Sequence, residues 1–415
     1  MSSKRDLIQP RTLKGFRDFL PESMHAREWL LDTAREVFRS YGFAGIDTPV
    51  LEYEEILTGK GSEESDKQMY AFEDNGGRRV GMRFDLTVPL ARFVAQHENE
   101  LGLPFKRYHI GPVWRAENTQ RGRYREFMQC DFDTIGTESI AADCESAMVI
   151  HDLLDAVAGG EFTVSVNNRR MLSGYLERLG LAERASAVLR ALDKLDKIGA
   201  EKVSEELERE ASATEAEVAA VLELAAISGT REEVLAKLGP LVEGSELGER
   251  GLEELREVCA ALAAAGISES RVVLDPKVAR GFDYYTGTVF EAKLLDLSDI
   301  GSVCSGGRYD ELAGLYTKSH LPGIGASLGV DRLLTALEEL GRVERRATPA
   351  QGFVPYFSAD RLADYFGLAA GLRSEGLAVE VYPEPRKLGA QLKFAERVKK
   401  EKNLQPPEDC SACHR

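Results

Sequence analysis

Cysteine is scarce in this 415-residue chain, which holds six, at positions 130, 144, 259, 304, 410 and 413. So few, scattered cysteines predict free thiols in a reducing compartment and exclude a disulfide-stabilised secreted scaffold. The sequence also lacks an apolar run long enough to cross a membrane, and its N-terminus MSSKRDLIQP lacks the apolar stretch of a secretory signal. We therefore predict a cytoplasmic protein with no membrane partner.

Clusters with metal-ligand spacing are also lacking. Cys410, Cys413 and His414 match the spacing of haem attachment. We interpret that match as chance, because a chain that is not exported has no attachment pathway. Three possible ligands also fall short of a closed tetrahedral zinc set. We predict no protein metal site.

Basic residues are outnumbered, with 53 Lys and Arg against 69 Asp and Glu, which gives a net charge of −16. This balance excludes a protein that is basic overall, but a polyanion needs only a local basic patch. The segment 121–125 could supply one, since it holds Arg121, Arg123 and Arg125. The chain length and 43% hydrophobic content predict a soluble globular protein of two or three domains.

The segment ARGFDYYTGTVFE, residues 279–291, combines Arg280 and Asp283 with two adjacent phenols, Tyr284 and Tyr285. Residues 284–290 are rich in aromatic and β-branched residues, which predicts a strand. A guanidinium binds phosphate or carboxylate, and tyrosine offers an apolar wall with a hydrogen-bonding tip. The segment favours a pocket for an anion and a polar ring. The alternative is an ordinary strand with core tyrosines and a surface arginine.

Two further segments are rich in glycine. In GSVCSGGRYDEL, residues 301–312, Gly306 and Gly307 allow a tight turn or a close approach to a ligand, and the alternative is a glycine hairpin. The second segment, GIGASLGVDRLL, residues 323–334, has its last glycine one residue too late for a dinucleotide fingerprint. It predicts a glycine-rich strand that enters a helix, with Arg332 near the first turn as an anion ligand.

Residues 105–136 predict an antiparallel hairpin with strands over 106–115 and 124–135 and a basic loop over 116–122. Gln129, Asp131 and Asp133 alternate along the second strand, so they share one face. A polar face beside an arginine-rich loop indicates a binding site. The alternative is a solvated, charged hairpin.

Together these segments resemble the histidyl-tRNA synthetase family of class II aminoacyl-tRNA synthetases. The hairpin resembles motif 2, residues 323–334 resemble motif 3, and the segments at 279–291 and 301–312 resemble the two histidine signatures. Three N-terminal segments, residues 14–22, 41–52 and 83–95, also resemble this family. The second of them, YGFAGIDTPVLE, is similar to motif 1, with its proline at Pro49. The resemblance implies an α+β fold, with a class II synthetase-type antiparallel sheet flanked by helices, a helical insertion and a partial α/β C-terminal domain.

The resemblance also implies a domain order. Residues 1–172 form the first part of the catalytic core, with motifs 1 and 2, and residues 266–338 form the second part, with the histidine signatures and motif 3. An Ala-, Glu- and Leu-rich helical insertion occupies residues 173–265, and residues 339–351 are a linker. Residues 352–415 predict strand, helix, strand and helix, similar to a truncated anticodon-binding domain with an atypical tail.

The activity implied is ATP-dependent histidine–tRNA ligation with Mg²⁺, on L-histidine and tRNA(His), in a homodimer. Arg115 and Arg280 are the implied catalytic residues. The implied ATP-binding residues are Arg115, Glu117, Arg123 and Arg332, with Glu117 at the adenine. The implied histidine-binding residues are Asp85, Leu86, Thr87, Gln129, Asp133, Tyr284, Tyr285 and Tyr309, with Asp85 and Tyr285 at the imidazole ring and Gln129, Asp133 and Thr87 at the ammonium.

An inactive paralogue that acts as a regulatory or histidine- and tRNA-sensing subunit is the alternative. Such a protein is expected to lack the helical insertion and to lose signature residues. The present chain keeps the insertion together with Arg115, Arg280 and Arg332. These features favour the enzyme.

Overall fold

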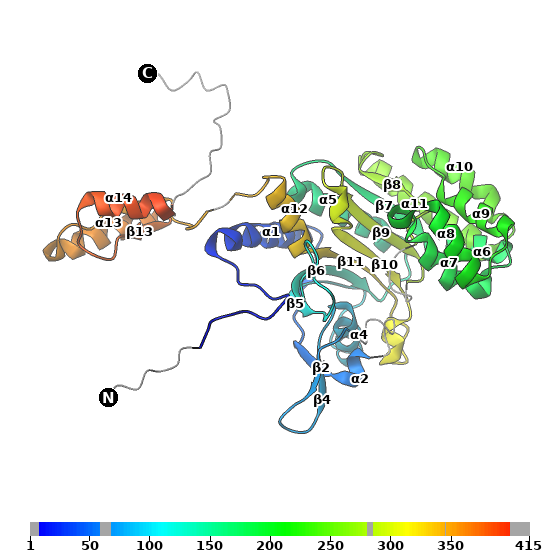
Figure 1. Ribbon diagram of the computed structural model, residues 1–415, viewed down its shortest axis with the longest axis horizontal. Coiled ribbons are helices and arrows are strands. Elements are labelled where there is room, and N and C mark those ends of the chain that lie inside the picture. Colours follow the sequence, from blue (N-terminus) through cyan, green and yellow to red (C-terminus); the bar gives the residue numbers. More distant parts are fainter. Residues whose placement is uncertain (1–7, 59–67, 280–284, 345, 399–415) are drawn as a thin grey trace, which may run out of the picture. The chain divides into compact units, whose positions relative to one another are not determined.

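The computed structural model describes residues 8–58, 68–279, 285–344 and 346–398 (Figure 1). The chain divides into two compact units, one made of Met1–Phe16 with Leu31–Arg342 and the other of Arg17–Leu30 with Val343–Arg415. Helix α1 (Pro21–Ser40) contributes residues to both units.

The larger unit is built on an eight-stranded sheet with the order β1-β5-β6-β11-β10-β9-β7-β8. The six strands from β5 to β7 are antiparallel, whereas the outermost strands β1 and β8 pair in parallel with β5 and β7. The predicted antiparallel sheet is confirmed at its centre, and the sheet as a whole is mixed. Its strands are β1 (Ala44–Gly45), β5 (Phe105–Trp114), β6 (Glu126–Ile135), β7 (Phe162–Asn168), β8 (Val272–Leu274), β9 (Thr288–Leu294), β10 (Cys304–Tyr309) and β11 (Gly323–Gly329).

The predicted hairpin is present as β5 and β6, joined by the loop over residues 115–125. Successive side chains of β6 point to opposite faces of the sheet. Phe132 packs against Phe38 of α1 and against Phe43, with ring centroids 5.5 and 5.4 Å apart. The other face carries Gln129, Asp131 and Asp133.

Gly306 and Gly307 lie inside β10, so the glycine hairpin is wrong. A Cβ atom on Gly306 would lie 2.1 Å from the carbonyl oxygen of Gly325 on the neighbouring strand β11. Glycine is needed here because the two strands approach each other too closely for a side chain. The predicted passage from glycine-rich strand to helix is confirmed, since α12 (Val330–Glu339) follows β11 directly.

The strand predicted over residues 284–290 begins later, at Thr288. Its partner β7 ends at Asn168, opposite Thr288, where α6 begins, so the preceding residues have no β7 strand to pair with. Tyr285 therefore precedes the strand. Arg280, Asp283 and Tyr284 lie outside the described residues.

The segment predicted to be helical is helical, and its first helix begins at Arg169, upstream of residue 173. Capping boxes of Thr214 with Glu217 and of Thr230 with Glu233 begin two of the helices. The predicted glycine stop is Gly266, at φ +74° just after the last helix. The helices are α6 (Arg169–Arg178), α7 (Ala185–Leu192), α8 (Leu195–Ala211), α9 (Glu215–Ala225), α10 (Arg231–Val242) and α11 (Glu246–Ala264).

A smaller antiparallel sheet joins β2 (Leu51–Tyr53), β4 (Arg79–Met82) and β3 (Ala71–Glu73). Pro49 lies between β1 and β2 and not in a strand. Helices α2 (Glu54–Leu57) and α4 (Thr87–Gln96) pack beside this sheet around Leu57, Phe84 and Val88. Helix α5 (Ala141–Ala158) packs against β7, β9 and β11 of the main sheet.

The second unit has the predicted order of strand, helix, strand and helix. Its strands β12 (Gly352–Val354) and β13 (Val379–Val381) form a two-stranded parallel sheet. Its helices are α13 (Leu362–Ser374) and α14 (Leu388–Val398). Val354, Ala369 and Val379 form its small core.

The four cysteines within the described ranges, at positions 130, 144, 259 and 304, are buried free thiols. Cys410, Cys413 and His414 lie outside those ranges. Among the helices that the structure describes, none is both long and apolar enough to cross a membrane.

Candidate active site

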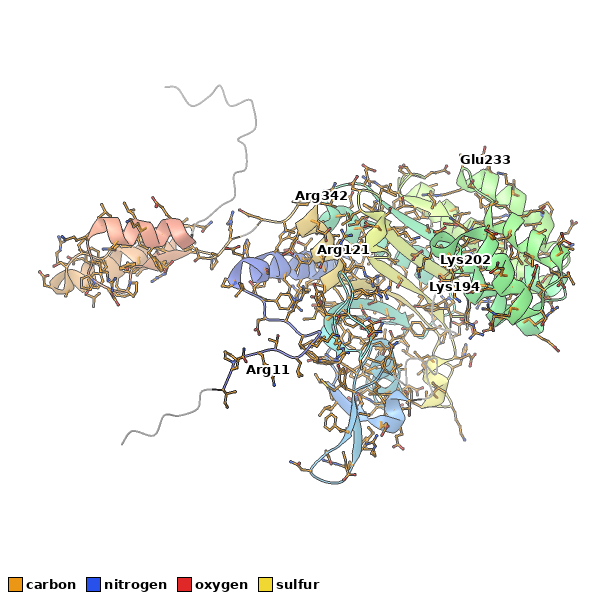
Figure 2. All side chains as sticks on the ribbon, viewed as in Figure 1. Arg11, Arg121, Lys194, Lys202, Glu233 and Arg342 are labelled. Carbon is orange, nitrogen blue, oxygen red and sulfur yellow. The ribbon has the colours of Figure 1, made fainter. Side chains whose placement is uncertain are left out.

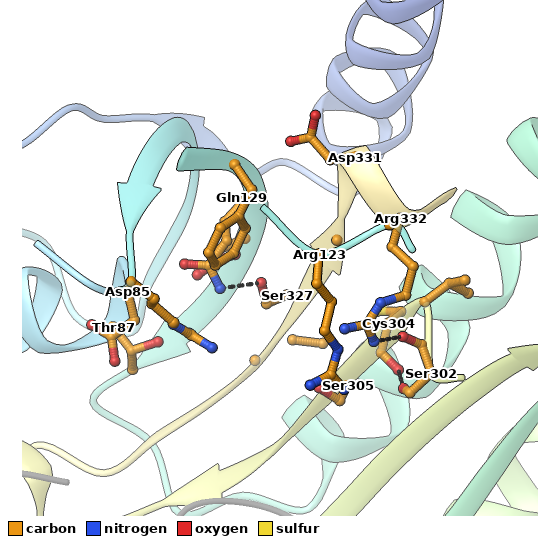
Figure 3. Close-up of a pocket in the computed structure, with 18 of the residues that line it drawn as sticks. Asp85, Thr87, Arg123, Gln129, Ser302, Cys304, Ser305, Ser327, Asp331 and Arg332 are labelled. Carbon is orange, nitrogen blue, oxygen red and sulfur yellow. Dashed lines mark hydrogen bonds between the residues drawn. The ribbon is translucent and has the colours of Figure 1, made fainter. Parts of the chain in front are cut away.

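A cavity of about 320 Å³ opens in the larger unit and is lined by strands β6, β10 and β11. The first turn of α4, the start of α12 and the loop between β5 and β6 complete its wall. The volume lies within the range of small-molecule sites. Figure 3 shows Asp85 and Thr87 at one end of the cavity and Arg123 and Arg332 toward the other.

The predicted polar face of β6 forms part of this cavity, because Gln129, Asp131 and Asp133 all line it. All three side chains are buried, and Gln129 Nε2 donates a hydrogen bond to Ser327 Oγ at 2.9 Å. Within the described part of the chain, three acceptor atoms here have neither a hydrogen-bond donor nor an ion-pair partner: Asp85 Oδ2, Gln129 Oε1 and Asp131 Oδ1. Buried acceptors without donors are costly, so the cavity favours a ligand rich in N–H groups.

A fully buried arginine lies beside this acidic face. Arg107 on β5 is directly opposite Asp133, and its Nη2 atom is 2.5 Å from Asp133 Oδ2. The two atoms form an ion pair without the alignment of a hydrogen bond. Arg107 does not line the cavity, and it balances the charge of Asp133 from the neighbouring strand on the same face of the sheet.

Burial raises the pKa of Asp131 to about 7 and that of Asp133 to about 6, although Arg107 acts in the opposite direction on both. Removal from water disfavours the charged carboxylate, and the two acids also repel each other. Burial likewise raises the pKa of Asp85. Three acids held in one small space, with shifted pKa values, are typical of a binding or catalytic site.

Asp85 is placed by the start of α4, where its Oδ1 atom accepts a hydrogen bond of 3.1 Å from the backbone N–H of Val88. Thr87, the first residue of that helix, lines the cavity beside it. Leu86, a predicted histidine-binding residue, is fully buried, and its neighbours Asp85 and Thr87 line the cavity instead.

Two tyrosines complete the acidic end. The hydroxyl of Tyr309 donates a hydrogen bond to Asp133 Oδ1, and burial raises its pKa well above the usual value. Tyr285 also lines the cavity, and its ring lies 3.0 Å from where a Cβ atom of Gly307 would stand. A side chain on Gly307 would therefore displace this ring. Tyr284 lies outside the described residues.

The basic end brings together residues from distant parts of the sequence. Arg115, Glu117 and Arg123 from the loop line the cavity with Arg332 from α12. Arg115 Nε donates to the carbonyl oxygen of Phe84 at 2.9 Å, and Arg332 Nη1 donates to that of Ser302. The guanidinium groups of Arg115, Arg123 and Arg332 thus share one cavity with the acidic floor. Arg280, the fourth predicted cation, lies outside the described residues.

The other arginines of the loop have different roles. Arg121, labelled in Figure 2, is exposed. It forms an ion pair with Glu339 at the end of α12 and another with Asp299, whose Oδ2 atom is 2.8 Å from Arg121 Nη1. Arg125 Nε donates to the carbonyl oxygen of Glu117 at 3.1 Å, which orders the loop itself. The predicted basic patch is thus partly neutralised by its own surroundings.

A chain of charged contacts fixes the strands behind Tyr285. Thr286 Oγ1 donates to Asp310 Oδ2 at 2.6 Å, and Arg308 and Arg170 donate to the same carboxylate at 3.3 and 3.1 Å. Arg170 also pairs with Glu254 of α11 at 2.5 Å. These contacts connect the end of β10 to helices α6 and α11.

Asp131, Ser327, Cys304 and Ser305 also line the cavity. The alternation of β6 places Asp131 on the correct face, but the family resemblance gives it no role. The register of β10 with β11, and of β11 with β6, decides which serines and cysteines reach the cavity. That register cannot be read from the separate segments.

The described residues hold no group of three or more His, Cys, Asp or Glu side chains that could bind a metal ion. A resident magnesium site therefore does not fit these residues.

Residues 15–333 match the family model of histidyl-tRNA synthetase. The histidine–tRNA ligase of Rhodopirellula baltica is 60% identical to the chain over 390 residues, covering 94% of the chain and 88% of that protein. The histidyl-tRNA synthetase of Nostoc sp. PCC 7120 has a similar structure, with a TM-score of 0.87 and 35% identity over 94% of the chain and 90% of its own. A Bacillus halodurans structure described as an ATP phosphoribosyltransferase regulatory subunit/histidyl-tRNA synthetase has a TM-score of 0.79 and 25% identity, over 94% of the chain and 97% of its own.

Proposed function

The chain belongs to the histidyl-tRNA synthetase family, and we propose that the cavity described above is where it joins L-histidine to ATP. It is a histidine–tRNA ligase. It converts L-histidine and ATP to histidyl-adenylate and pyrophosphate, and then transfers histidine to the 3′ end of tRNA(His). The regulatory alternative is not favoured, because 94% of the chain matches a histidine–tRNA ligase at 60% identity.

The acidic end of the cavity is the proposed histidine subsite. Asp85 and Tyr285 receive the imidazole ring, and Gln129, Asp133 and Thr87 receive the ammonium group. The support is the set of buried acceptors without donors in the described residues. Tyr309, held by its hydrogen bond to Asp133, is proposed to form a wall of the subsite, and Tyr284 is proposed to form another part of its wall. Leu86 contributes by packing beneath Asp85.

The basic end is the proposed ATP subsite. During activation, the histidine carboxylate attacks the α-phosphorus and pyrophosphate leaves, so negative charge grows on phosphoryl oxygens. Fixed guanidinium groups stabilise such charge without proton transfer. We assign Arg115 and Arg280 to the α-phosphate, Arg332 to the γ-phosphate, Arg123 to the triphosphate and Glu117 to the adenine amino group.

Magnesium enters this scheme only as MgATP. The described residues offer no cluster of ligands for a resident ion, whereas Mg²⁺ binds readily to phosphate oxygens and water. No step in the scheme depends on a protein-bound metal.

A homodimer in the cytoplasm is also proposed. The segment similar to motif 1 and the adjoining small sheet expose large apolar side chains, namely Val50, Leu51, Tyr53 and Phe72, with 37 to 52% of each accessible. A cluster of exposed apolar side chains of this kind marks an interaction surface.

The observation that carries the proposal is the meeting of the acidic floor and the guanidinium groups in one cavity. The decisive experiment is pyrophosphate exchange with the purified protein, ATP and Mg²⁺. Exchange is expected with L-histidine and not with other amino acids. A rate of pyrophosphate exchange that does not depend on L-histidine would refute the assignment of the cavity. Charging of tRNA(His), measured beside it, tests the second step.

A further inference from the structure

Asp131 has no role in the assignment above, although it lies in the middle of the cavity floor. Its side chain is 2% exposed, and its Oδ1 atom has no hydrogen-bond donor among the described residues. It sits between Gln129 and Asp133 on the same face of β6. A buried carboxylate with an unused oxygen aimed at a cavity is an expensive feature to keep without a ligand.

Ser327 connects Asp131 to the proposed ammonium site. It stands directly opposite Asp131 in the register of β11 with β6, and its hydroxyl forms a hydrogen bond with Asp131. The same hydroxyl accepts a hydrogen bond of 2.9 Å from Gln129 Nε2. One serine therefore orients both side chains, and within the described residues Gln129 Oε1 and Asp131 Oδ1 have no hydrogen-bond partner, so both oxygens remain available to a ligand.

The charge of Asp131 also favours a cationic ligand. Asp85, Asp131 and Asp133 line the cavity, and Arg107 forms an ion pair with Asp133, whereas none of the ion pairs among the described residues includes Asp131. When ionised, Asp131 therefore carries a charge that no described ion pair neutralises. A neutral imidazole cannot balance it, whereas an ammonium group brings one positive charge and three N–H donors.

We propose that Asp131 binds the α-ammonium group of histidine together with Gln129, and that it makes the site select amino acids over deaminated analogues. This assignment rests on the proposed function of the cavity. It adds a specificity-determining residue to the histidine subsite.

The first test is Asp131→Asn in pyrophosphate exchange. The KM for histidine is expected to rise roughly ten- to hundredfold, because a hydrogen bond to a charged partner is lost. The KM for ATP is expected to stay within about twofold, since the two subsites are separate. Asp155→Asn, an exposed acid on α5, is the matched control and should change neither value.

A second measurement separates binding from support of the fold. Asparagine keeps the shape of Asp131 and removes the buried charge, so the thermal midpoint of the ligand-free variant at pH 8 is expected to equal or exceed that of the wild type. A structural role would instead lower that midpoint together with histidine affinity. That result would overturn the proposal.

A third measurement identifies the group that Asp131 binds. Histidinol keeps the ammonium group and lacks the carboxylate, whereas 3-(imidazol-4-yl)propanoate keeps the ring and carboxylate and lacks the ammonium group. Asp131→Asn is expected to weaken histidinol binding by the same factor as the histidine KM and to leave the propanoate unchanged. Equal weakening of both would place Asp131 at the ring and refute the proposal, as would no weakening of either.

These results also separate the inference from the function on which it rests. Calorimetric binding of histidinol needs no catalysis, so it tests Asp131 even if the wild-type protein fails to exchange pyrophosphate. Exchange by the wild type with an unaffected Asp131→Asn variant would refute the inference alone.

Discussion

Arg107 and Asp133 face each other across strands β5 and β6, with Arg107 Nη2 2.5 Å from Asp133 Oδ2 and both side chains almost wholly buried. The pair ties the proposed histidine subsite to the stability of the central sheet. Asp133 also accepts a hydrogen bond from Tyr309, so its carboxylate connects strand β6 to both β5 and β10.

Replacing Arg107 with methionine should leave this carboxylate buried without its cation. We expect the free energy of unfolding to fall by about 3 kcal/mol at pH 8. The folded-state pKa of Asp133 is raised, so the stability contributed by its neutral form is complete at low pH and is lost as the pH rises through about 6. The defect should therefore shrink at pH 5.

Urea unfolding at the two pH values measures this difference. Arg107→Met with Asp133→Asn should recover part of the loss at pH 8, because the uncompensated charge is then absent. A defect that is equal at both pH values would contradict the electrostatic explanation.

Histidine binding should depend on pH through the acidic floor. Since the pKa values of Asp131 and Asp133 are raised to about 7 and about 6, both are largely neutral below pH 5.5 and attract an ammonium group poorly. The KM for histidine in pyrophosphate exchange is expected to fall several-fold as the pH rises from about 5.5 to about 8. The charged groups that interact with Asp131 are Arg83, Asp85, Arg107 and Asp133, and the other titratable groups around it are Tyr285, Cys304 and His109, the last directly opposite Asp131 on β5.

The imidazole of the substrate titrates in the same range. Asp131→Asn is the control for this effect, because both enzymes see the same substrate. Its profile should lose the component near pH 7. Superimposable profiles for the two proteins would show that Asp131 does not titrate in histidine binding.

Arg332→Ala should impair the nucleotide subsite selectively. We expect the KM for ATP to rise at least roughly tenfold, because a charge-assisted contact to phosphate is lost, while the KM for histidine changes less than about threefold. Arg121→Ala is the matched control, since Arg121 is also an arginine beside α12 but is exposed and engaged with Glu339 and Asp299. Steady-state exchange kinetics check both. An equal rise of the ATP KM in the two variants would argue against a specific role for Arg332.

Gly325→Ala should disturb the cavity floor and the sheet together. A Cβ atom at this position would lie 2.1 Å from the carbonyl oxygen of Phe132 and 2.3 Å from Asp133 Oδ1. We expect a loss of about 1–3 kcal/mol in the free energy of unfolding and a raised KM for histidine. Gly102→Ala, where a Cβ atom meets nothing within 4 Å, should be neutral. Urea unfolding and exchange kinetics of the two variants test this contrast.

Leu51→Lys should weaken the proposed homodimer. Leu51 is 45% exposed on strand β2, beside exposed Tyr53, and burying a charge there at an interface would be costly. Light scattering after size-exclusion chromatography should show a dimer for the wild type and more monomer for the variant. Leu295, just after β9, is 53% exposed, and the Leu295→Lys variant should keep the dimer mass of the wild type. A wild-type monomer would refute the proposed assembly.

Local patterns in the sequence predicted the elements that depend on neighbours along the chain. The alternation over residues 124–135 gave the β5–β6 hairpin and its polar face, and the strand–helix passage around Arg332 was also correct. Where the chain must pair with a distant strand, the prediction was less accurate. The strand expected at residue 284 begins at Thr288, because its partner ends there.

Two features of the site could not be predicted from the sequence for a physical reason. Gly306 and Gly307 lie in a strand and not in a turn, since the close approach of β11 requires the first and that of β9 and Tyr285 requires the second. Arg107 is fully buried because the strand register brings it to its counterion, Asp133, which lies more than twenty residues away in the sequence. Such pairings appear only when the register is known.

The alternation of β6 has a consequence for how this gene can change. An insertion or deletion of a single codon at the start of residues 129–133 would reverse the facing of the residues that follow it, so that Phe132 would face the cavity while Asp133 entered the aromatic layer around Phe38. Point substitutions along β6 alter one contact at a time. Amino-acid substitutions in this strand should therefore be tolerated much more often than changes in its length.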